Sequence, residues 1–381
     1  METLNNIVLT IQNYMSNYIL VIALLGAGLW FSIRLGFIQV RGFGESMRRT
    51  FGGLFSKKGE AGADGMSSFQ ALATAIAAQV GTGNIAGAAT ALAIGGAGAI
   101  FWMWIAAFLG MATIYAEAIM AQKYKTVGAD GQVTGGPVYY IRAAFKGTFG
   151  KVLAGIFAVL ITLALGFMGN AVQSNSIAAA FHTAFGIPQW IMGLAVAVIA
   201  LFVFAGGIER IAKVTETVVP FMAALYIVGA LIIIIYNYKN IPYAFASIFV
   251  GAFAPQSVVG GAAGATVKLA LTKGVARGLF SNEAGMGSTP HAHAVAKVNH
   301  PVEQGFVAMA GVFIDTFIVL NLTALVILTT KSIPTGLTGA ELSQYAFSTL
   351  YGKGGNVFIA ICMFFFAFST IIGWYFFGQA N

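Results

Sequence analysis

Residues 77–87 interrupt one of the long apolar segments of this chain of 381 residues, and they decide the fold. They read Ala77-Ala78-Gln79-Val80-Gly81-Thr82-Gly83-Asn84-Ile85-Ala86-Gly87. Glycine and polar residues in the middle of an apolar run predict a broken helix. In lipid an unpaired backbone group is costly, so a break is tolerated only where protein or a ligand satisfies the freed groups. Close helix packing through Gly83 and Gly87 is the alternative interpretation.

The composition places the rest of the chain in a membrane. Apolar residues make up 58% of the sequence and charged residues only 8%, whereas a soluble domain carries about 25% charged residues. Stretches of about 20 apolar residues recur, which predicts an all-α integral membrane protein rather than a β-barrel. A soluble enzyme, a nucleic-acid-binding protein and a disordered protein are therefore excluded. The net charge of +8 is attributed to basic loops.

Nine apolar segments are predicted to cross or enter the bilayer. They are residues 17–33, 67–94, 97–121, 150–184, 188–206, 213–236, 257–296, 303–330 and 345–378. Lys and Arg concentrate in alternate loops, with fourteen on one side and three on the other, and basic loops face the cytoplasm. This bias predicts a multi-pass protein of the plasma (inner) membrane with its N-terminus outside. It also places a short basic turn near residues 207–213.

A second interruption lies in the seventh apolar segment. It reads Lys273-Gly274-Val275-Ala276-Arg277-Gly278-Leu279-Phe280-Ser281-Asn282-Glu283-Ala284-Gly285-Met286-Gly287-Ser288. We expect Arg277 and Glu283 to form a buried pair, unless the stretch is only a loop. Two broken helices in corresponding positions of inverted halves are typical of secondary transporters, which bind their substrate and ion at the breaks. Half-helix N-termini attract a carboxylate, and freed carbonyls suit Na⁺.

Four stretches of the sequence resemble the motifs of one family. They are Gly81-Thr82-Gly83-Asn84, Gly95-Gly96-Ala97-Gly98-Ala99-Ile100-Phe101-Trp102-Met103-Trp104-Ile105-Ala106-Ala107-Phe108-Leu109-Gly110, Leu279-Phe280-Ser281-Asn282-Glu283-Ala284-Gly285-Met286-Gly287-Ser288 and Ser369-Thr370-Ile371-Ile372-Gly373-Trp374. They are similar to those of the alanine/glycine:cation symporters, also called sodium:alanine symporters. The resemblance implies a leucine-transporter-like inverted repeat with one extra N-terminal helix, lacking the last two helices of the family.

The resemblance also implies a division of the chain and a substrate site. Residues 1–66 would form the extra transmembrane helix and a basic cytoplasmic loop, 67–238 the first repeat (core helices one to five) and 239–381 the second repeat (core helices six to eight). The residues implied to bind the substrate are Thr82, Gly83, Gln173, Val275, Gly278, Leu279, Thr370 and Trp374.

Each of these residues has an implied role. N–H groups of Thr82 and Gly83 would hold the substrate carboxylate, and Gln173 would add an amide donor. Thr370 and Trp374 would close the far side, with Trp374 favouring small side chains. The alternative for Gln173 is the solvated outer end of a long helix.

Three of the implied residues belong to the second interruption. Val275, Gly278 and Leu279 would line the pocket at the break in the seventh segment, with a carbonyl facing the substrate ammonium.

A Na⁺ site is implied beside the substrate. It would use the backbone carbonyls of Ala77 and Val80 and the hydroxyls of Ser369 and Thr370, an oxygen shell that suits a hard cation. The alternative is that both hydroxyls merely bond carbonyls of their own helix.

The function implied is Na⁺-coupled symport of a small neutral amino acid, L-alanine or glycine, by alternating access. The coupling ion implied is Na⁺. No enzyme activity is expected, because no nucleophile–base–acid set is visible in the sequence. Proton coupling through Asp315 and a passive channel subunit are the alternatives. Asp315 could instead pair with a helix hydroxyl or with Lys268 or Lys273. His291 and His293 are poorly spaced for a metal and are expected at a cytoplasmic helix end.

Overall fold

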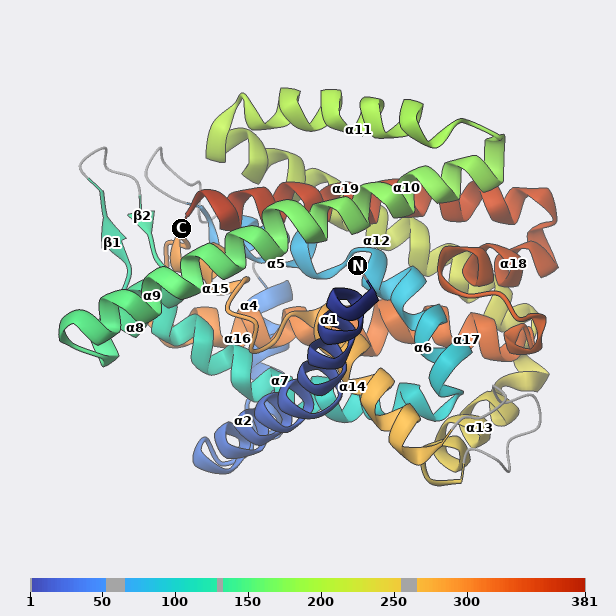
Figure 1. The fold of residues 1–381 in the computed structure, drawn as a ribbon, viewed down its shortest axis with the longest axis horizontal. Helices are drawn as coiled ribbons and strands as arrows, with labels where there is room; N and C mark the ends of the chain where they lie inside the picture. The colour runs from blue at the N-terminus through green and yellow to red at the C-terminus, as the bar shows by residue number, and fades with distance from the viewer. Residues whose placement is uncertain (1, 53–65, 129–132, 255–265, 381) are drawn as a thin grey trace.

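The computed structural model of the protein describes residues 2–52, 66–128, 133–254 and 266–380. Within these ranges the chain is a bundle of helices with one small β-hairpin (Figure 1). The described helices that are long and apolar enough to cross a membrane are Asn5–Arg34, Gly98–Lys123, Gly147–Phe185, Gly207–Tyr236, Pro301–Thr329 and Lys353–Gln379. This architecture confirms the predicted all-α membrane protein.

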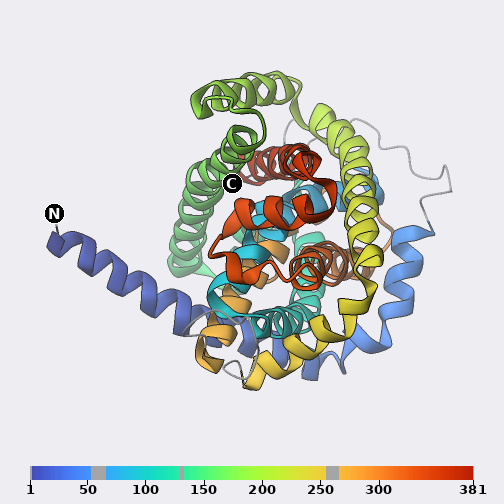
Figure 2. The same ribbon diagram turned by 90° about the vertical axis from the view of Figure 1, so that its right-hand side faces the viewer.

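An apolar helical rod opens the chain and projects from the bundle (Figure 2). It consists of α1 (Glu2–Tyr14), η1 (Met15–Ile19) and α2 (Leu20–Arg34). The helix therefore begins well before residue 17, the start predicted from hydropathy. The rod's last part, α2, packs along α7 (Gly98–Lys123), and two short helices, α3 (Ile38–Arg41) and α4 (Phe43–Phe51), follow it.

The first predicted break is confirmed. Helix α5 (Ser68–Gln79) begins with a capping box, in which Ser67 and Gln70 satisfy each other's backbone N–H groups. The helix ends at Gln79 and resumes as η2 (Gly83–Gly87) and α6 (Ala88–Gly95).

The middle of the chain contains the longest helical segment. The elements after α7 are the hairpin β1 (Thr126–Val127) and β2 (Val133–Thr134), α8 (Pro137–Ala144), α9 (Gly147–Ile161), η3 (Thr162–Gly169), α10 (Asn170–Phe185), α11 (Gln189–Phe204) and α12 (Gly207–Tyr236). The pieces α9, η3 and α10 run as one helix of 39 residues. The basic stretch 207–213, predicted to be a turn, is the first part of α12. The chain turns at the first residue of this helix, Gly207, whose φ of +64° lies in the left-handed region.

The remaining elements form the second half of the bundle. They are η4 (Tyr238–Asn240), α13 (Ile241–Phe253), α14 (Val267–Asn282), α15 (Pro290–Ala294), α16 (Pro301–Val312), η6 (Phe313–Leu320), α17 (Asn321–Thr329), η7 (Ile333–Thr335), α18 (Gly339–Tyr351) and α19 (Lys353–Gln379). The predicted segment 345–378 spans two helices, since Gly352 at φ +55° separates α18 from α19. The start of the predicted segment 257–296 lies outside the described residues.

The second break lies later than predicted. Helix α14 is continuous from Val267 to Asn282, and the interruption covers residues 283–289. The placement of Val275, Gly278 and Leu279 at the break is therefore wrong. The reason is close packing: a β-carbon at Gly278 would lie 3.3 Å from the Cα of Met103 in α7, so this glycine lets two helices approach.

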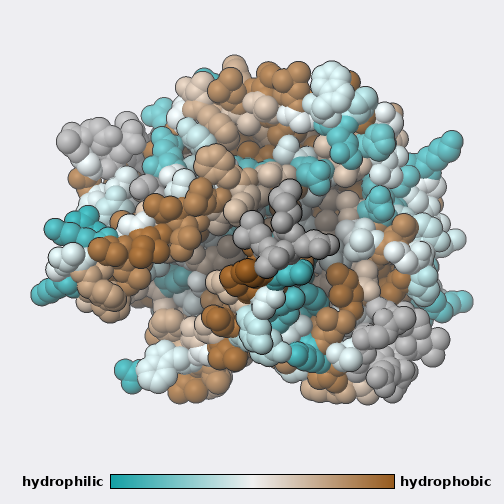
Figure 3. Space-filling view, viewed as in Figure 1, coloured by the Kyte–Doolittle hydropathy of each residue, from teal (hydrophilic) through white to brown (hydrophobic). Residues whose placement is uncertain are grey.

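The first broken helix lies inside the bundle. In Figure 1 it runs between α10 and α19 on one side and α7 and α14 on the other, and α5 also packs on α12. The outer helices α9–α11 carry exposed apolar side chains such as Ile156, Phe202 and Trp190. Figure 3 shows such apolar surface along the face seen in Figure 1. Apolar residues inside and outside are what a bundle surrounded by lipid requires.

Candidate substrate and cation site

The break after α5 frees backbone carbonyls, among them that of Ala77. In a continuous helix the N–H of Gly81 would bond this oxygen, but here it donates to Gln79 O at 3.0 Å and to Asn84 Oδ1 at 3.0 Å. Val80 has non-helical dihedral angles (φ −83°, ψ 85°), so the helical ladder stops at this point. The free oxygen of Ala77 is therefore available to side chains of another helix.

Two hydroxyl groups of α19 donate hydrogen bonds to that oxygen. Ser369 Oγ donates to Ala77 O at 3.3 Å and Thr370 Oγ1 at 3.0 Å. Both hydroxyls also bond the oxygen of Phe366 in their own helix, at 2.9 Å and 3.0 Å, so the alternative weighed from the sequence holds as well. The structure brings together Ala77, Ser369 and Thr370, three of the four residues predicted around Na⁺, and Val80 follows in the same chain turn. These neutral oxygens fit a hard monovalent cation.

The predicted substrate residues Thr82, Gln173 and Thr370 also meet at this break. The N–H of Thr82 donates to Gln173 Oε1 at 3.2 Å, and Gln173 is buried rather than solvated. A β-carbon at Gly81 would lie 2.3 Å from Thr370 Oγ1, so only glycine fits between the two helices. Because the carbonyl of Gln173 is used here, its NH₂ group is the part that could donate to a ligand.

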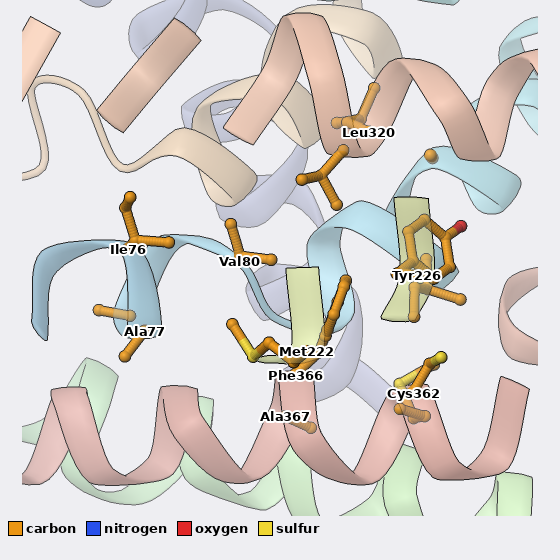
Figure 4. Close-up of a cluster of buried hydrophobic side chains, with 14 of the residues drawn as sticks. Ile76, Ala77, Val80, Met222, Tyr226, Leu320, Cys362, Phe366 and Ala367 are labelled. Carbon is orange, nitrogen blue, oxygen red and sulfur yellow. The ribbon is translucent and has the colours of Figure 1, made fainter. Parts of the chain in front are cut away.

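Buried apolar side chains pack beside the break. Figure 4 shows Ala77 and Val80 of the first broken helix near α19, with Met222 of α12 and Phe366 beside them. All four side chains belong to one buried cluster. Such a shell excludes water and strengthens polar interactions at the break.

The two breaks touch each other. A β-carbon at Gly83 would lie 3.0 Å from the Cα of Ser281, the second-last residue of α14. Gln79 Nε2 donates to the oxygen of Asn282 at 2.8 Å, so the end of α5 caps the end of α14. The breaks therefore form one continuous polar region.

A buried carboxylate anchors this region on η6. Asp315 Oδ1 accepts hydrogen bonds from Asn84 Nδ2 at 2.6 Å and from Ser281 Oγ at 3.0 Å, and its Oδ2 accepts one from Thr316 Oγ1 at 2.8 Å. The expected pairing of Asp315 with a helix hydroxyl is thus confirmed. Lys268 bonds Tyr18 instead.

Glu283 has partners other than the predicted one. Its carboxylate accepts hydrogen bonds from Trp374 Nε1 and Ser288 Oγ, and no ion pair joins it to Arg277 in the described part of the chain. The expected pair of Arg277 and Glu283 is therefore wrong. The loop after Glu283 is held by Glu117 of α7, which accepts the N–H of Gly285 at 3.0 Å.

The remaining predicted residues occupy other surroundings. Val275 and Leu279 pack in a cluster with Val21 of α2 and Ala106 of α7. Sequence reasoning did not assign roles to Ser281 or Gln79, and the only signal for them was polarity within apolar runs. His291 and His293, expected at a cytoplasmic helix end, are buried in the short helix α15.

Comparison with known proteins identifies the family. The sodium:alanine symporter family matches residues 1–381, the whole chain. This chain belongs to that family. Its relatives include the sodium/alanine symporter AgcS of Methanococcus maripaludis, 42% identical over 98% of this chain and 82% of that one. The amino-acid carrier protein AlsT of Bacillus subtilis is 44% identical over 94% of this chain and 74% of that one.

Two further proteins are similar to this chain, one in sequence and one in structure. The probable sodium/glutamine symporter GlnT of Bacillus subtilis is 41% identical over 100% of this chain and 77% of that one. The Eremococcus coleocola manganese transporter has a structure that matches with a TM-score of 0.56 at 13% identity, over 82% of this chain and 64% of that one. At that identity the likeness shows the fold, which is leucine-transporter-like. This sodium:alanine symporter family member is a multi-pass membrane transporter and not an enzyme.

Proposed function

We propose that this family member couples the entry of a small neutral amino acid, L-alanine or glycine, to the entry of Na⁺ by alternating access. One observation carries the proposal: at the break after α5, two hydroxyls bond the freed carbonyl of Ala77, and the N–H of Thr82 meets the buried amide of Gln173. A zwitterion needs donors for its carboxylate, and Na⁺ needs neutral oxygens. The relative named as a sodium/alanine symporter supports this pairing of substrate and ion.

The proposed substrate site consists of residues that meet at the first break. The N–H groups of Thr82 and Gly83 and the NH₂ group of Gln173 hold the carboxylate once the Thr82 N–H leaves Gln173 Oε1, and Thr370 and Trp374 bound the side chain. Val275, Gly278 and Leu279 stay outside this set, because they lie in the continuous part of α14.

The proposed Na⁺ site adjoins the substrate. The carbonyls of Ala77 and Val80 and the hydroxyls of Ser369 and Thr370 bind the ion after the two hydroxyls rotate their protons away from Ala77 O. Thr370 is shared by both sites, which couples occupation of one to occupation of the other. Since the zwitterion carries no net charge, one Na⁺ moves one charge per cycle, worth about 2.3 kcal/mol at 100 mV. That free energy supports roughly fifty-fold accumulation.

The proposal includes the organisation of the chain. The rod and basic segment 1–66 precede a first repeat, 67–238, and a second repeat, 239–381. The excess of Lys and Arg in alternate loops favours a plasma-membrane protein with its N-terminus outside.

Uptake into liposomes tests the function. Purified protein should accumulate radiolabelled L-alanine when Na⁺ is present outside, and replacement of Na⁺ by choline should abolish the accumulation. Uptake that continues unchanged in choline contradicts Na⁺ coupling. Unlabelled glycine and glutamine as competitors decide between the substrate classes suggested by AgcS and GlnT.

Proton coupling is a second candidate, and one observation favours it. Asp315 is a fully buried carboxylate whose side-chain partners are Asn84, Ser281 and Thr316, and in the described residues no Lys or Arg pairs with it. Burial without a cation favours the uptake of a proton by a carboxylate. Uptake driven by a pH gradient without Na⁺, and lost in D315N, would establish this candidate.

A further inference from the structure

Glu283 is a buried acidic residue with an unusual backbone. It follows α14 directly, its side chain is fully buried, and its φ of +58° lies in the left-handed region. Residues other than glycine adopt this conformation rarely, and when they do so it often marks a functional position. The residue belongs to the second break and is not itself assigned above to substrate or Na⁺, but it bonds Trp374, which is assigned to the substrate site.

Both carboxylate oxygens of Glu283 are engaged. Oε1 accepts the indole N–H of Trp374 at 2.5 Å, and Oε2 accepts the hydroxyl of Ser288 at 2.5 Å. A hydrogen bond to an ionised acceptor is short, strong and directional. An indole has a single donor, so this bond fixes the rotation of the ring about its own side-chain bonds.

The ring of Trp374 stands at one end of the proposed substrate site. Trp374 follows Thr370 by one helical turn, and Gly169 precedes Gln173 by one turn, so each pair shares a helix face. A β-carbon at Gly169 would lie 2.3 Å from Cζ3 of the indole, which shows that the ring occupies the space against the long helix. Phe280 packs on its other side, with ring centroids 6.2 Å apart.

We propose that Glu283 is a specificity-determining positioning residue that holds the Trp374 indole as a fixed wall of the substrate site. The fixed ring excludes neutral amino acids whose side chains are longer than a methyl group. This inference rests on the proposed amino-acid site but adds a residue that does not touch the substrate. It acts through the orientation of one ring, because breaking the bond lets the indole rotate and enlarges the site.

Binding selectivity tests this assignment. Affinities of the purified protein for L-alanine and L-leucine are measured by competition against radiolabelled L-alanine. In E283Q, which keeps the size of the side chain but removes its charge, the preference for alanine over leucine should fall about tenfold, because a neutral amide oxygen accepts the indole N–H more weakly than a carboxylate does. The variant E283D, whose side chain is shorter, should lose the same preference. It keeps the test possible if E283Q does not fold. The matched control S288A keeps the bond to Trp374 and should retain the preference within about twofold.

A double-mutant cycle separates positioning from a general structural effect. W374F removes the N–H but keeps a ring, and E283Q added to W374F should change selectivity no further, since no indole bond remains to be lost. Effects that multiply in the double variant, or an unchanged preference in both Glu283 variants, overturn the inference while leaving alanine binding by the wild type intact. A wild type that binds no alanine contradicts the proposed function instead.

A spectroscopic measurement addresses the indole without any substrate. The ultraviolet resonance Raman band of the indole N–H, taken as wild type minus W374F, should show a strongly hydrogen-bonded ring. The same difference taken in the E283Q background should show a weakened bond. An identical band in both backgrounds contradicts the positioning role even if the transport substrate proves to be different.

Discussion

Gln79 Nε2 donates a hydrogen bond to the main-chain oxygen of Asn282 over 2.8 Å. The side chain of the last residue of α5 thus satisfies the carbonyl of the last residue of α14. The two residues are 203 positions apart in sequence. Both are buried, and the bond joins the two broken helices directly. A movement of either break must therefore keep or replace this contact.

Removal of the Gln79 amide should destabilise the protein. Q79A leaves the buried oxygen of Asn282 without its donor, at a cost of about 1–3 kcal/mol. We expect a lower melting temperature for the detergent-solubilised variant, measured by size-exclusion chromatography after heating. Q189A alters an exposed glutamine at the start of α11 and serves as the control. Equal melting temperatures for Q79A and the wild type would contradict the capping role.

Substitution of Gly81 should impair ligand binding. In G81A the new β-carbon would lie 2.3 Å from Thr370 Oγ1, so Thr370 must leave Ala77 O or the break must widen. We expect alanine affinity to fall at least about tenfold, in line with the loss of one well-placed polar contact. G155A in α9 is a matched control, because nothing lies within 4 Å of its added carbon. Wild-type affinity in G81A would show that the contact between Thr370 and the break is dispensable.

Loss of the Thr370 hydroxyl should affect Na⁺ more than loss of the Trp374 ring does. Thr370 bonds Ala77 O, whereas the indole N–H of Trp374 bonds Glu283, which lies outside the proposed ion shell. We expect T370A to raise the Na⁺ concentration for half-maximal alanine uptake about tenfold, and W374A to change it much less. The opposite order of effects would count against the proposed ion site.

The half-buried surface acid Glu45 should remain ionised in acidic solution. Hydrogen bonds from Arg48 and then Arg49 lower the pKa of Glu45 from 4.5 to about 2. Because the folded pKa is the lower one, the contribution of this carboxylate to stability is complete above about pH 4.5 and is lost as the pH falls towards 2.

The measurement compares the wild type with E45Q. Their difference in melting temperature should shrink between pH 4.5 and the lowest pH that the protein tolerates. Since the group lies at the surface, the difference should be small and should shrink further in high salt. A difference that grows as the pH falls would contradict the direction of the shift.

Local signals in the sequence were enough for the architecture and for the first break. Long apolar runs and scarce charges determine a helical membrane protein, because a bilayer accepts few other structures. The Gly81-Thr82-Gly83 stretch ends α5 where expected, because glycine and threonine interrupt an apolar helix by their own backbone and side-chain preferences.

Only the tertiary structure decided the second break and the partners of the buried acids. Gly278 permits α14 to pack on α7 and leaves the helix intact, so the interruption starts at Glu283. The bonds of Asp315 to Asn84 and of Glu283 to Trp374 span 231 and 91 positions. A polar residue in an apolar run indicates that its side chain needs a hydrogen-bond partner. Which residue becomes that partner depends on which helices the fold places face to face.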